Sequence, residues 1–233
     1  MRIVLLGPQG VGKGTQAQRL SERIGAPHVS TGDLVRAEIA AQTPLGRTIK
    51  DCTERGELAP DEVIVSLALT HLADKTSWIL DGFPRTLTQA RALDEALANV
   101  GESLDCVLAL QAPDAEVVER LSGRRQSEAT GRIYNLANDP PPPDDPGPFV
   151  QREDDHPDNI RRRLQIYHTA TEPLKGYYAE RGLLREIDST GPIDAVTDAI
   201  LTVLDALPAR TGKAQVAGTG RATPQARAAK LAS

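Results

Sequence analysis

A glycine-rich segment near the start of the chain has the composition of a phosphate-binding loop. Residues 7–15 read Gly-Pro-Gln-Gly-Val-Gly-Lys-Gly-Thr and follow the apolar run Ile3–Leu6. They fit the pattern G-x-x-x-x-G-K, with the Thr15 hydroxyl one place later than usual. Glycines free backbone N–H groups to wrap an anion, the following helix N-terminus attracts it, and Lys13 supplies a compact positive charge. We therefore predict a nucleotide-phosphate site here rather than a glycine-rich turn without a ligand.

Two more clusters of polar residues follow predicted strands. Residues 30–36 contain Ser30, Thr31, Asp33 and Arg36, although alone this string is more typical of an ordinary helix N-cap. Residues 81–85 read Asp-Gly-Phe-Pro-Arg. A carboxylate at a strand end, such as Asp81, is where a phosphate-loop enzyme holds its metal. The proline fixes the turn that aims the arginine.

Alternating strands and helices must position these clusters. Apolar strands are expected at 3–6, 78–80 and 106–110, with a short strand at 28–29 and a final one at 183–187. Helices are expected between them, including one long helix from about 158 that carries Ile160, Leu164 and Tyr167 at helical spacing. This order predicts an α/β fold with a doubly wound, parallel, five-stranded sheet. Ligands bind beyond the carboxyl ends of such strands, so the three clusters should meet at one edge.

Composition excludes several classes of function. The 233 residues carry a net charge of −5, and only 3% are aromatic, which disfavours a general nucleic-acid binder. The first apolar run is too short for a signal peptide or a membrane span. Cys52 and Cys106 are expected to be reduced thiols in a cytoplasmic protein. No nucleic-acid or membrane partner is therefore expected.

Two segments interrupt the strand–helix pattern. Residues 124–155 are polar, with six prolines between 140 and 148, so no core helix passes through them. Ile133, Tyr134 and Phe149 suffice for a small satellite cluster there. Residues 208–233 hold five basic and no acidic side chains and show no periodicity, which predicts a disordered tail. We favour a tolerated extension over a tail that contacts nucleic acid, membrane or a partner.

Several longer stretches together resemble the adenylate kinase family. They are GPQGVGKGTQA (7–17), STGDLVRAEI (30–39), GELAPDEVI (56–64), LDGFPRTLTQA (80–90), ERLSGRR (119–125), TGRIY (130–134), QREDD (151–155) and RRRLQIYH (161–168). The resemblance covers nearly all of residues 1–207. It implies a phosphate-loop core (1–29, 60–121 and 157–207), an AMP-binding insert (30–59) and a lid over ATP (122–156). The implied reaction is ATP + AMP ⇌ 2 ADP, carried out by a monomer.

The resemblance also assigns roles residue by residue. The residues implied for ATP are Gly10, Val11, Gly12, Lys13, Gly14, Thr15, Arg120, Arg124, Ile133, Tyr134 and Gly191. Those implied for AMP are Thr31, Arg36, Glu57, Leu58, Ala59, Gly82, Phe83, Pro84, Arg85, Gln89, Arg152 and Arg163. The catalytic charges are Lys13, Arg85, Arg124, Arg152 and Arg163, because planar guanidinium groups bind phosphate oxygens in pairs. Asp33 and Asp81 are expected near Mg²⁺, through water.

The lid departs from the zinc-holding members of the family. It contains no cysteine, so no zinc site is expected. The hydroxyls of Ser127 and Thr130, with Asp144 or Asp145, are candidates for a polar substitute. Asp154 and Asp155, which stand beside Arg152, either pair across the lid hinge or form a solvated charge run.

Two alternative functions remain open from the sequence. One is a UMP/CMP kinase on the same scaffold, although Gln89 and the Thr31 site favour AMP in the family pattern. The other is a non-catalytic ATP-binding module, against which the nearly complete set of arginines and carboxylates argues.

Overall fold

Five parallel strands form the central sheet, as expected from the sequence. The computed structural model describes residues 1–54, 59–137, 139–152 and 155–208. The strands are β1 (Arg2–Leu6), β2 (His28–Ser30), β3 (Trp78–Asp81), β4 (Cys106–Gln111) and β8 (Leu184–Asp188). Their order is β2-β3-β1-β4-β8, and every neighbouring pair is parallel. The carboxyl ends of β1, β2 and β3, which precede the three polar clusters, therefore lie side by side.

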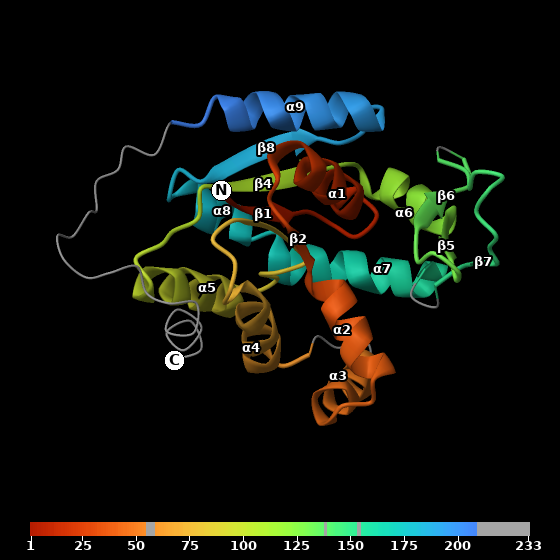
Figure 1. The fold of residues 1–233 in the computed structure, drawn as a ribbon, viewed down its shortest axis with the longest axis horizontal. Helices are drawn as coiled ribbons and strands as arrows, with labels where there is room; N and C mark the ends of the chain where they lie inside the picture. Colours follow the sequence, from red (N-terminus) through yellow and green to blue (C-terminus); the bar gives the residue numbers. More distant parts are fainter. Residues whose placement is uncertain (55–58, 138, 153–154, 209–233) are drawn as a thin grey trace.

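Helices cover both faces of this sheet (Figure 1). Helices α1 (Lys13–Ile24) and α9 (Ile193–Asp205) lie on one face; α4 (Asp61–Leu72), α5 (Leu87–Asn99) and α8 (Leu174–Ala179) lie on the other. In β1, Ile3 and Leu5 pack in the core on the α1 side, whereas Val4 and Leu6 pack in the core on the α5 side. A strand buried on both faces reads as a continuous apolar run, which is why β1 was predictable.

A helical hairpin follows β2 and projects from the sheet. It consists of α2 (Thr31–Ala40) and α3 (Pro44–Glu54). Ser30 caps α2, because its hydroxyl accepts a hydrogen bond from the Asp33 N–H at 3.2 Å. Gly46 lets the two helices approach closely, since a Cβ there would lie 1.9 Å from the Glu38 carbonyl oxygen. The hairpin lies within the predicted insert 30–59.

A small antiparallel sheet forms the other projecting part of the molecule, within residues 122–156, for which we keep the name lid. Helix α6 (Asp114–Ser122) leads into β5 (Arg124–Ser127), which pairs with β6 (Ile133–Asn135) and β7 (Phe149–Val150). Tyr134 is buried and its ring meets Phe149 edge to face at 5.8 Å. Ile133 is 47% exposed, so the expectation that it joins this cluster is wrong. Side chains alternate along a strand, and Ile133 therefore points away from its neighbour Tyr134.

The chain returns from the lid through α7 (Pro157–Ile166), and then departs from the expected long helix. Residues Tyr167–Thr171 form a π-helical turn, η2, before α8. The Glu172 N–H bonds to the Tyr167 carbonyl, five residues earlier. Pro173 has no N–H with which to continue an α-helical ladder, and the wider turn precedes it.

Two findings concern the remaining sequence predictions. Among the described residues, no helix is both long and apolar enough to cross a membrane. Residues 209–233, which make up almost all of the tail expected to be disordered, lie outside the described part of the chain.

Candidate active site

The glycine-rich loop joins β1 to α1 in the predicted way. Gly12 occupies the N-cap of α1 with φ 101°, a left-handed conformation that favours glycine. Gly10 must also be glycine, because a Cβ there would lie 2.6 Å from Leu121 Cγ on α6. The Lys13 ammonium donates to the carbonyls of Gly7 at 2.8 Å and Pro8 at 2.7 Å. The loop is thus closed around its own lysine and packed against the helix that enters the lid.

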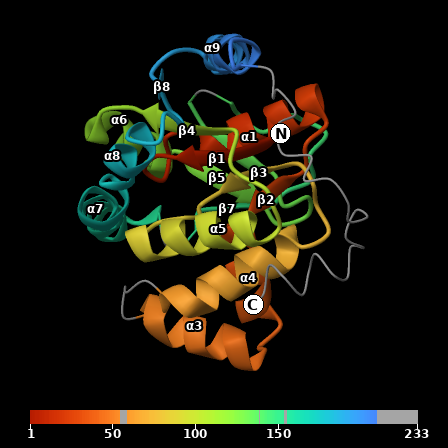
Figure 2. The ribbon, with the colours of Figure 1, turned by 90° about the vertical axis from the view of Figure 1, so that its left-hand side faces the viewer.

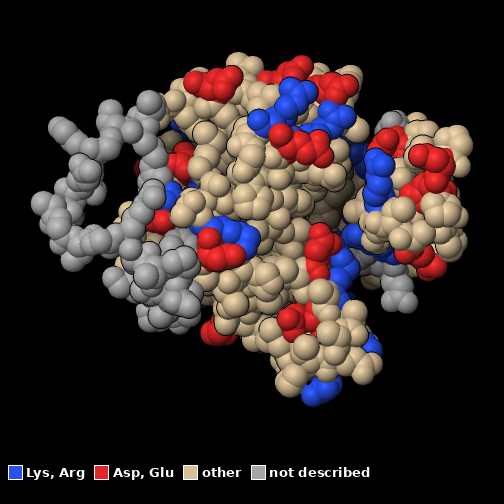
Figure 3. All heavy atoms as spheres, viewed as in Figure 1, with Lys and Arg blue, Asp and Glu red and all other residues tan. Residues whose placement is uncertain are grey.

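Lys13 lies in a strongly basic neighbourhood. Burial lowers the pKa of its ammonium to about 8, while the nearby Asp81 carboxylate opposes this shift. The guanidinium groups of Arg85, Arg163 and Arg124 lower the pKa further. These arginines come from three separate segments, so the fold brings four of the five predicted catalytic charges within electrostatic reach of one another. Figure 3 shows basic side chains of the lid on the side that faces the body.

The second and third polar clusters meet at the ends of β2 and β3. The Thr31 hydroxyl donates to the Asp81 carbonyl at 3.1 Å. Gly82 has φ +82°, and a Cβ on it would lie 2.8 Å from the Thr31 hydroxyl. The Arg85 Nε donates to the Gly82 carbonyl at 2.7 Å, which fixes the guanidinium beside this corner. Thr171, on η2, holds the same turn by donating to the Arg85 carbonyl at 2.9 Å.

Gln89 is held by a partner that sequence reasoning missed. Its amide donates to the Asp61 carboxylate at 2.7 Å and accepts from the Arg85 N–H at 2.7 Å. Asp61 also accepts from the Thr86 hydroxyl at 2.9 Å. Gln89 is only 2% exposed, yet its amide nitrogen and oxygen each have capacity for one further bond. Asp61 opens α4, far from Gln89 in sequence, and no local pattern indicates the pair.

Asp33 and Arg36 form an ion pair on the first turns of α2. Partial burial raises the pKa of the Asp33 carboxyl. The Arg36 guanidinium more than offsets this effect and holds the pKa below its usual range, and Arg152 acts in the same direction as Arg36. Arg152 of the lid therefore lies within electrostatic reach of the α2 hairpin. Its Nε donates to the Gln126 side chain at 2.9 Å.

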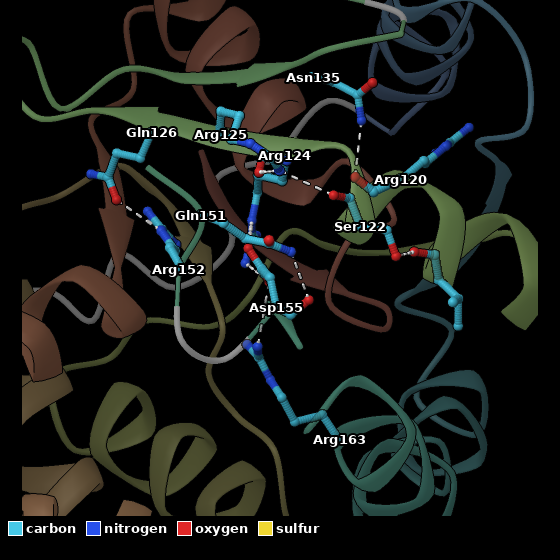
Figure 4. A network of polar contacts seen from close by, with 11 residues as sticks. Arg120, Ser122, Arg124, Arg125, Gln126, Asn135, Gln151, Arg152, Asp155 and Arg163 are labelled. Atoms are coloured by element: carbon cyan, nitrogen blue, oxygen red, sulfur yellow. Dashed lines mark hydrogen bonds and ion pairs between the residues drawn. The ribbon is translucent and has the colours of Figure 1, made fainter. Parts of the chain in front are cut away.

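A buried carboxylate organises the lid arginines (Figure 4). Asp155 is completely buried and accepts two bonds from Arg124, with Nε at 2.7 Å from one carboxylate oxygen. Arg163 of α7 lies 3.9 Å from the other oxygen. Of the two sequence interpretations, pairing across the hinge is confirmed for Asp155, whereas Asp154 lies outside the described residues. A two-pronged carboxylate pair fixes the orientation of a guanidinium as well as its position.

Arg120 holds the loop connections below the lid. Its guanidinium donates to the Ser189 carbonyl at 2.7 Å and to the Val11 carbonyl at 3.4 Å, and it also pairs with Glu116. Asn135 of β6 donates to the Arg120 carbonyl at 2.9 Å. One side chain thus connects α6 to the glycine-rich loop and to the turn that precedes α9.

The remaining predicted residues occupy varied positions. Phe83 is fully buried in the core, so only its backbone faces the corner at Gly82. Ala59 is 8% exposed. Gly191 lies in open space, since no described atom comes within 4 Å of the place where its Cβ would be, and Gly14 and Thr15 reach the surface. Glu57 and Leu58 lie outside the described residues.

Comparison with known proteins shows which family shares these features. The family model described as adenylate kinase matches residues 5–183. An adenylate kinase of Streptomyces coelicolor is 45% identical over 213 residues, covering 88% of this chain and 98% of the relative. One of Salinibacter ruber is 47% identical over 210 residues, covering 89% and 99%. The chain belongs to the adenylate kinase family.

Family membership identifies the reaction as phosphoryl transfer between ATP and AMP. In this member of the family, residues 122–156 contain no cysteine. Asp145 accepts hydrogen bonds from the hydroxyls of Ser127, Thr130 and Tyr134 at 2.7–2.8 Å, and from the Gly147 N–H at 3.0 Å. These bonds hold the pKa of Asp145 far below its usual range, against the effect of burial. The polar substitute expected from the sequence is confirmed, with Asp145 as its centre.

Asp33 and Asp81, the carboxylates expected near a magnesium ion, differ in their surroundings. Among the described residues, no group of three His, Cys, Asp or Glu side chains is placed to hold a metal alone. Mg²⁺ is commonly bound by one or two carboxylates together with phosphates and water. An Asp81 oxygen lies beside the first turn of α1, 3.7 Å from where a Gly14 Cβ would be. Asp33 is paired with Arg36, and the Asp81 carboxylate lies 3.7 Å from His28 Nε2. Of the two, Asp81 adjoins the glycine-rich loop and is the better candidate.

Proposed function

We propose that the ATP:AMP transfer takes place between the glycine-rich loop and the corner at Thr31, Gly82 and Arg85. ATP phosphates bind the loop and Lys13, whereas AMP binds between α2 and the Gly82–Arg85 turn. The observation that carries this assignment is the convergence of Lys13, Arg85, Arg124 and Arg163 in one electrostatic neighbourhood. Spread negative charge on a transferring phosphoryl group needs such a clamp.

The lid supplies the other half of the clamp in this proposal. Arg124 and Arg163 are held by Asp155, and Arg152 reaches toward the α2 side of the site. Residues 122–156 close over ATP, 30–59 close over AMP, and closure keeps water from taking the phosphoryl group. Mg²⁺ enters with ATP and neutralises phosphate charge, while Asp81 orients its water shell.

The acceptor is best tested with a panel of nucleoside monophosphates. AMP, UMP, CMP and GMP are offered with ATP, and ADP formation is followed with a coupled assay. We expect the highest kcat/KM with AMP, because the buried Gln89 amide has one donor and one acceptor left for a purine edge. A preference for UMP or CMP would favour the pyrimidine kinase, and ATP binding without acceptor-dependent ADP would favour the non-catalytic module.

The lid assignment is tested by Arg124→Ala. Loss of one preorganised donor costs about 10²–10³ in kcat, and near-UV and far-UV spectra should show an intact core. Arg161→Ala is the matched control, because Arg161 lies on α7 with its side chain 72% exposed and, within the described part of the chain, pairs only with Asp158. Equal activity of the Arg124 and Arg161 variants would contradict the role of Arg124.

A further inference from the structure

A histidine bridges two carboxylates where the lid joins the core. His168, on η2, places Nδ1 at 2.8 Å from the Glu172 carboxylate. Its Nε2 lies 3.0 Å from the carboxylate of Asp114, the first residue of α6. Neutral imidazole has one N–H, whereas both ring nitrogens here face acceptors. Both contacts are satisfied together only by the doubly protonated imidazolium.

The groups around the ring favour that charge. Hydrogen bonds to Glu172 and Asp114 raise the pKa of His168 above its ordinary value of 6.5. The other facing groups are Tyr167, edge to face at 5.4 Å, and Lys175 of α8. Lys175 lies 3.8 Å from Glu172 and 3.7 Å from Glu186 of β8, so its charge is shared with two carboxylates.

The bridge joins the two chain segments that carry the lid. Helix α6 leads out to β5, and α7 with η2 leads back. Figure 2 shows α6, α8 and α7 along the same flank of the molecule. Farther along, the two segments pack through Val117, Leu121, Ile160 and Leu164. His168, Asp114 and Pro8 of the glycine-rich loop line one cavity of about 100 Å³, so the bridge adjoins the phosphate site.

We propose that His168, as an imidazolium between Asp114 and Glu172, is a positioning residue that fixes the lid's two supporting segments beside the phosphate loop. The inference rests on the proposed binding of ATP by the lid. Arg120 and Arg124 follow Asp114 along the outgoing segment, and Arg163 precedes His168 on the returning one. Loss of the bridge changes how the two sets of arginines meet ATP. The bridging groups lie outside α2 and the Gly82–Arg85 turn, and Thr171 of η2 keeps its own bond to the Arg85 carbonyl. We therefore expect a smaller effect on AMP than on ATP.

The bridge has a defined pH dependence. A histidine whose pKa is raised by folding contributes its stabilisation fully below about pH 6.5, the unfolded value, and loses it as pH rises through the folded pKa. The lid attachment should therefore loosen on the alkaline side of that pKa.

Three variants test the proposal. His168→Gln removes the charge, and His168→Arg retains a donor-rich cation at every pH. His71→Gln is the matched control, since the His71 ring on α4 bonds to the Leu67 carbonyl of its own helix, away from the lid segments. KM for ATP and KM for AMP are measured for each variant and the parent between pH 6 and 9. At pH 6 we expect His168→Gln to raise KM for ATP about two- to fivefold, the scale of exposed ion pairs, with a smaller change in KM for AMP.

The parent should show the same rise as the ring deprotonates, and His168→Arg should not. Comparison of the parent with His168→Arg at each pH cancels the titration of Lys13. The proposal is overturned if His168→Gln leaves both constants unchanged, if KM for AMP rises as much as KM for ATP, or if His168→Arg keeps the parental pH dependence. If one of these results is obtained while Arg124→Ala still lowers kcat, only the proposal for His168 fails. The assignment of the lid to ATP is then kept.

A direct titration keeps the test independent of activity. The ring resonances of His168 are followed by NMR in the parent and in Asp114→Asn. We expect the midpoint to fall in Asp114→Asn, because one acceptor has lost its charge. An unchanged midpoint would show that the two side chains do not interact in solution and would overturn the proposal.

Discussion

The surroundings of Lys13 disfavour its charged form. Burial and three guanidinium groups lower its pKa to about 8, and Asp81 only partly opposes them. In the folded chain, the ammonium is therefore lost between about pH 8 and the ordinary 10.5. The folded state binds fewer protons than the unfolded chain in that window, so this group makes stability rise with pH there. ATP phosphates should reverse the shift, because they add negative charge beside the ammonium.

The pH dependence of the reaction tests the lowered pKa of Lys13. We expect kcat/KM for ATP, which reports the free enzyme, to fall about tenfold per pH unit above pH 8. The kcat, which reports the ATP complex, should remain constant to a higher pH. A kcat/KM that stays flat up to pH 10 would contradict the placement of Lys13. Lys13→Arg, which remains charged, should lose the alkaline limb whatever its absolute rate.

Sequence reasoning found the residues whose partners are local and missed those whose partners are distant. The glycine-rich loop needs only a strand, a turn and a helix in succession, all visible in residues 3–24. The pairing of Asp155 with Arg124 joins residues 31 positions apart, and the sequence left it undecided. The contact of Asp61 with Gln89 and that of His168 with Asp114, 54 positions away, escaped notice for the same reason, because a carboxylate or imidazole carries no local sign of a distant partner.

One carboxylate, Asp145, connects the strands and turns of the lid sheet. Asp145 collects three hydroxyls and one N–H, so Asp145→Asn removes the charge on which all four contacts depend. We expect amide hydrogen exchange in residues 124–150 to speed up about tenfold, with exchange in β1 and β4 unchanged. KM for ATP should rise and KM for AMP should not. The measurement is exchange followed by mass spectrometry.

The adjacent Asp144 provides the control for that experiment. Asp144→Asn makes the same charge change at an exposed side chain, so exchange in the lid should stay at the parental rate. Because the pKa of Asp145 is lowered, its contribution is present above about pH 3.9, the unfolded value, and is lost only as pH falls toward the folded one. Lid protection that disappears already at pH 5 would contradict this account.

Helices and strands could be predicted where a buried face gives the sequence a regular spacing of apolar residues. Strands β1, β3 and β4 follow from apolar runs, and most helices follow from 3.6-residue spacing. Strands β2 and β8 are mixed segments, expected from their place in the strand–helix order. The lid sheet did not, since β5 reads Arg-Arg-Gln-Ser and β7 has two residues. The pairing of the lid strands depends on polar contacts, and the prolines between 140 and 148 exclude a helix in that segment. The π-helical turn also lacks a periodic signal, because it differs from an α-helix by a single residue.

At the scale of the whole molecule, charge is divided between a body and a tail. Residues 208–233 hold five of the 27 basic side chains and no acidic ones, which leaves 22 basic against 32 acidic in the body. An acidic total is compatible with binding two phosphorylated nucleotides, because the local field of Lys13 and the arginines decides the site.

Removal of the tail tests whether it takes part in catalysis. Helix α9 ends at Asp205, before the tail begins. Deletion of residues 209–233 should leave kcat and both KM values within about twofold of the parent, because terminal segments tolerate such changes. A large loss of ATP affinity on deletion would assign the tail to the nucleotide site and reverse the interpretation of it as a tolerated extension.

The single tryptophan gives the chain a natural optical probe of its core. Trp78 begins β3 and is fully buried, at the end of the strand opposite Asp81 and the nucleotide site. Neither the α2–α3 hairpin nor the lid contains another tryptophan. Intrinsic fluorescence excited at the indole band therefore follows cooperative melting of the central sheet. Local opening of the lid leaves that emission unchanged, so the two processes can be separated in unmodified protein.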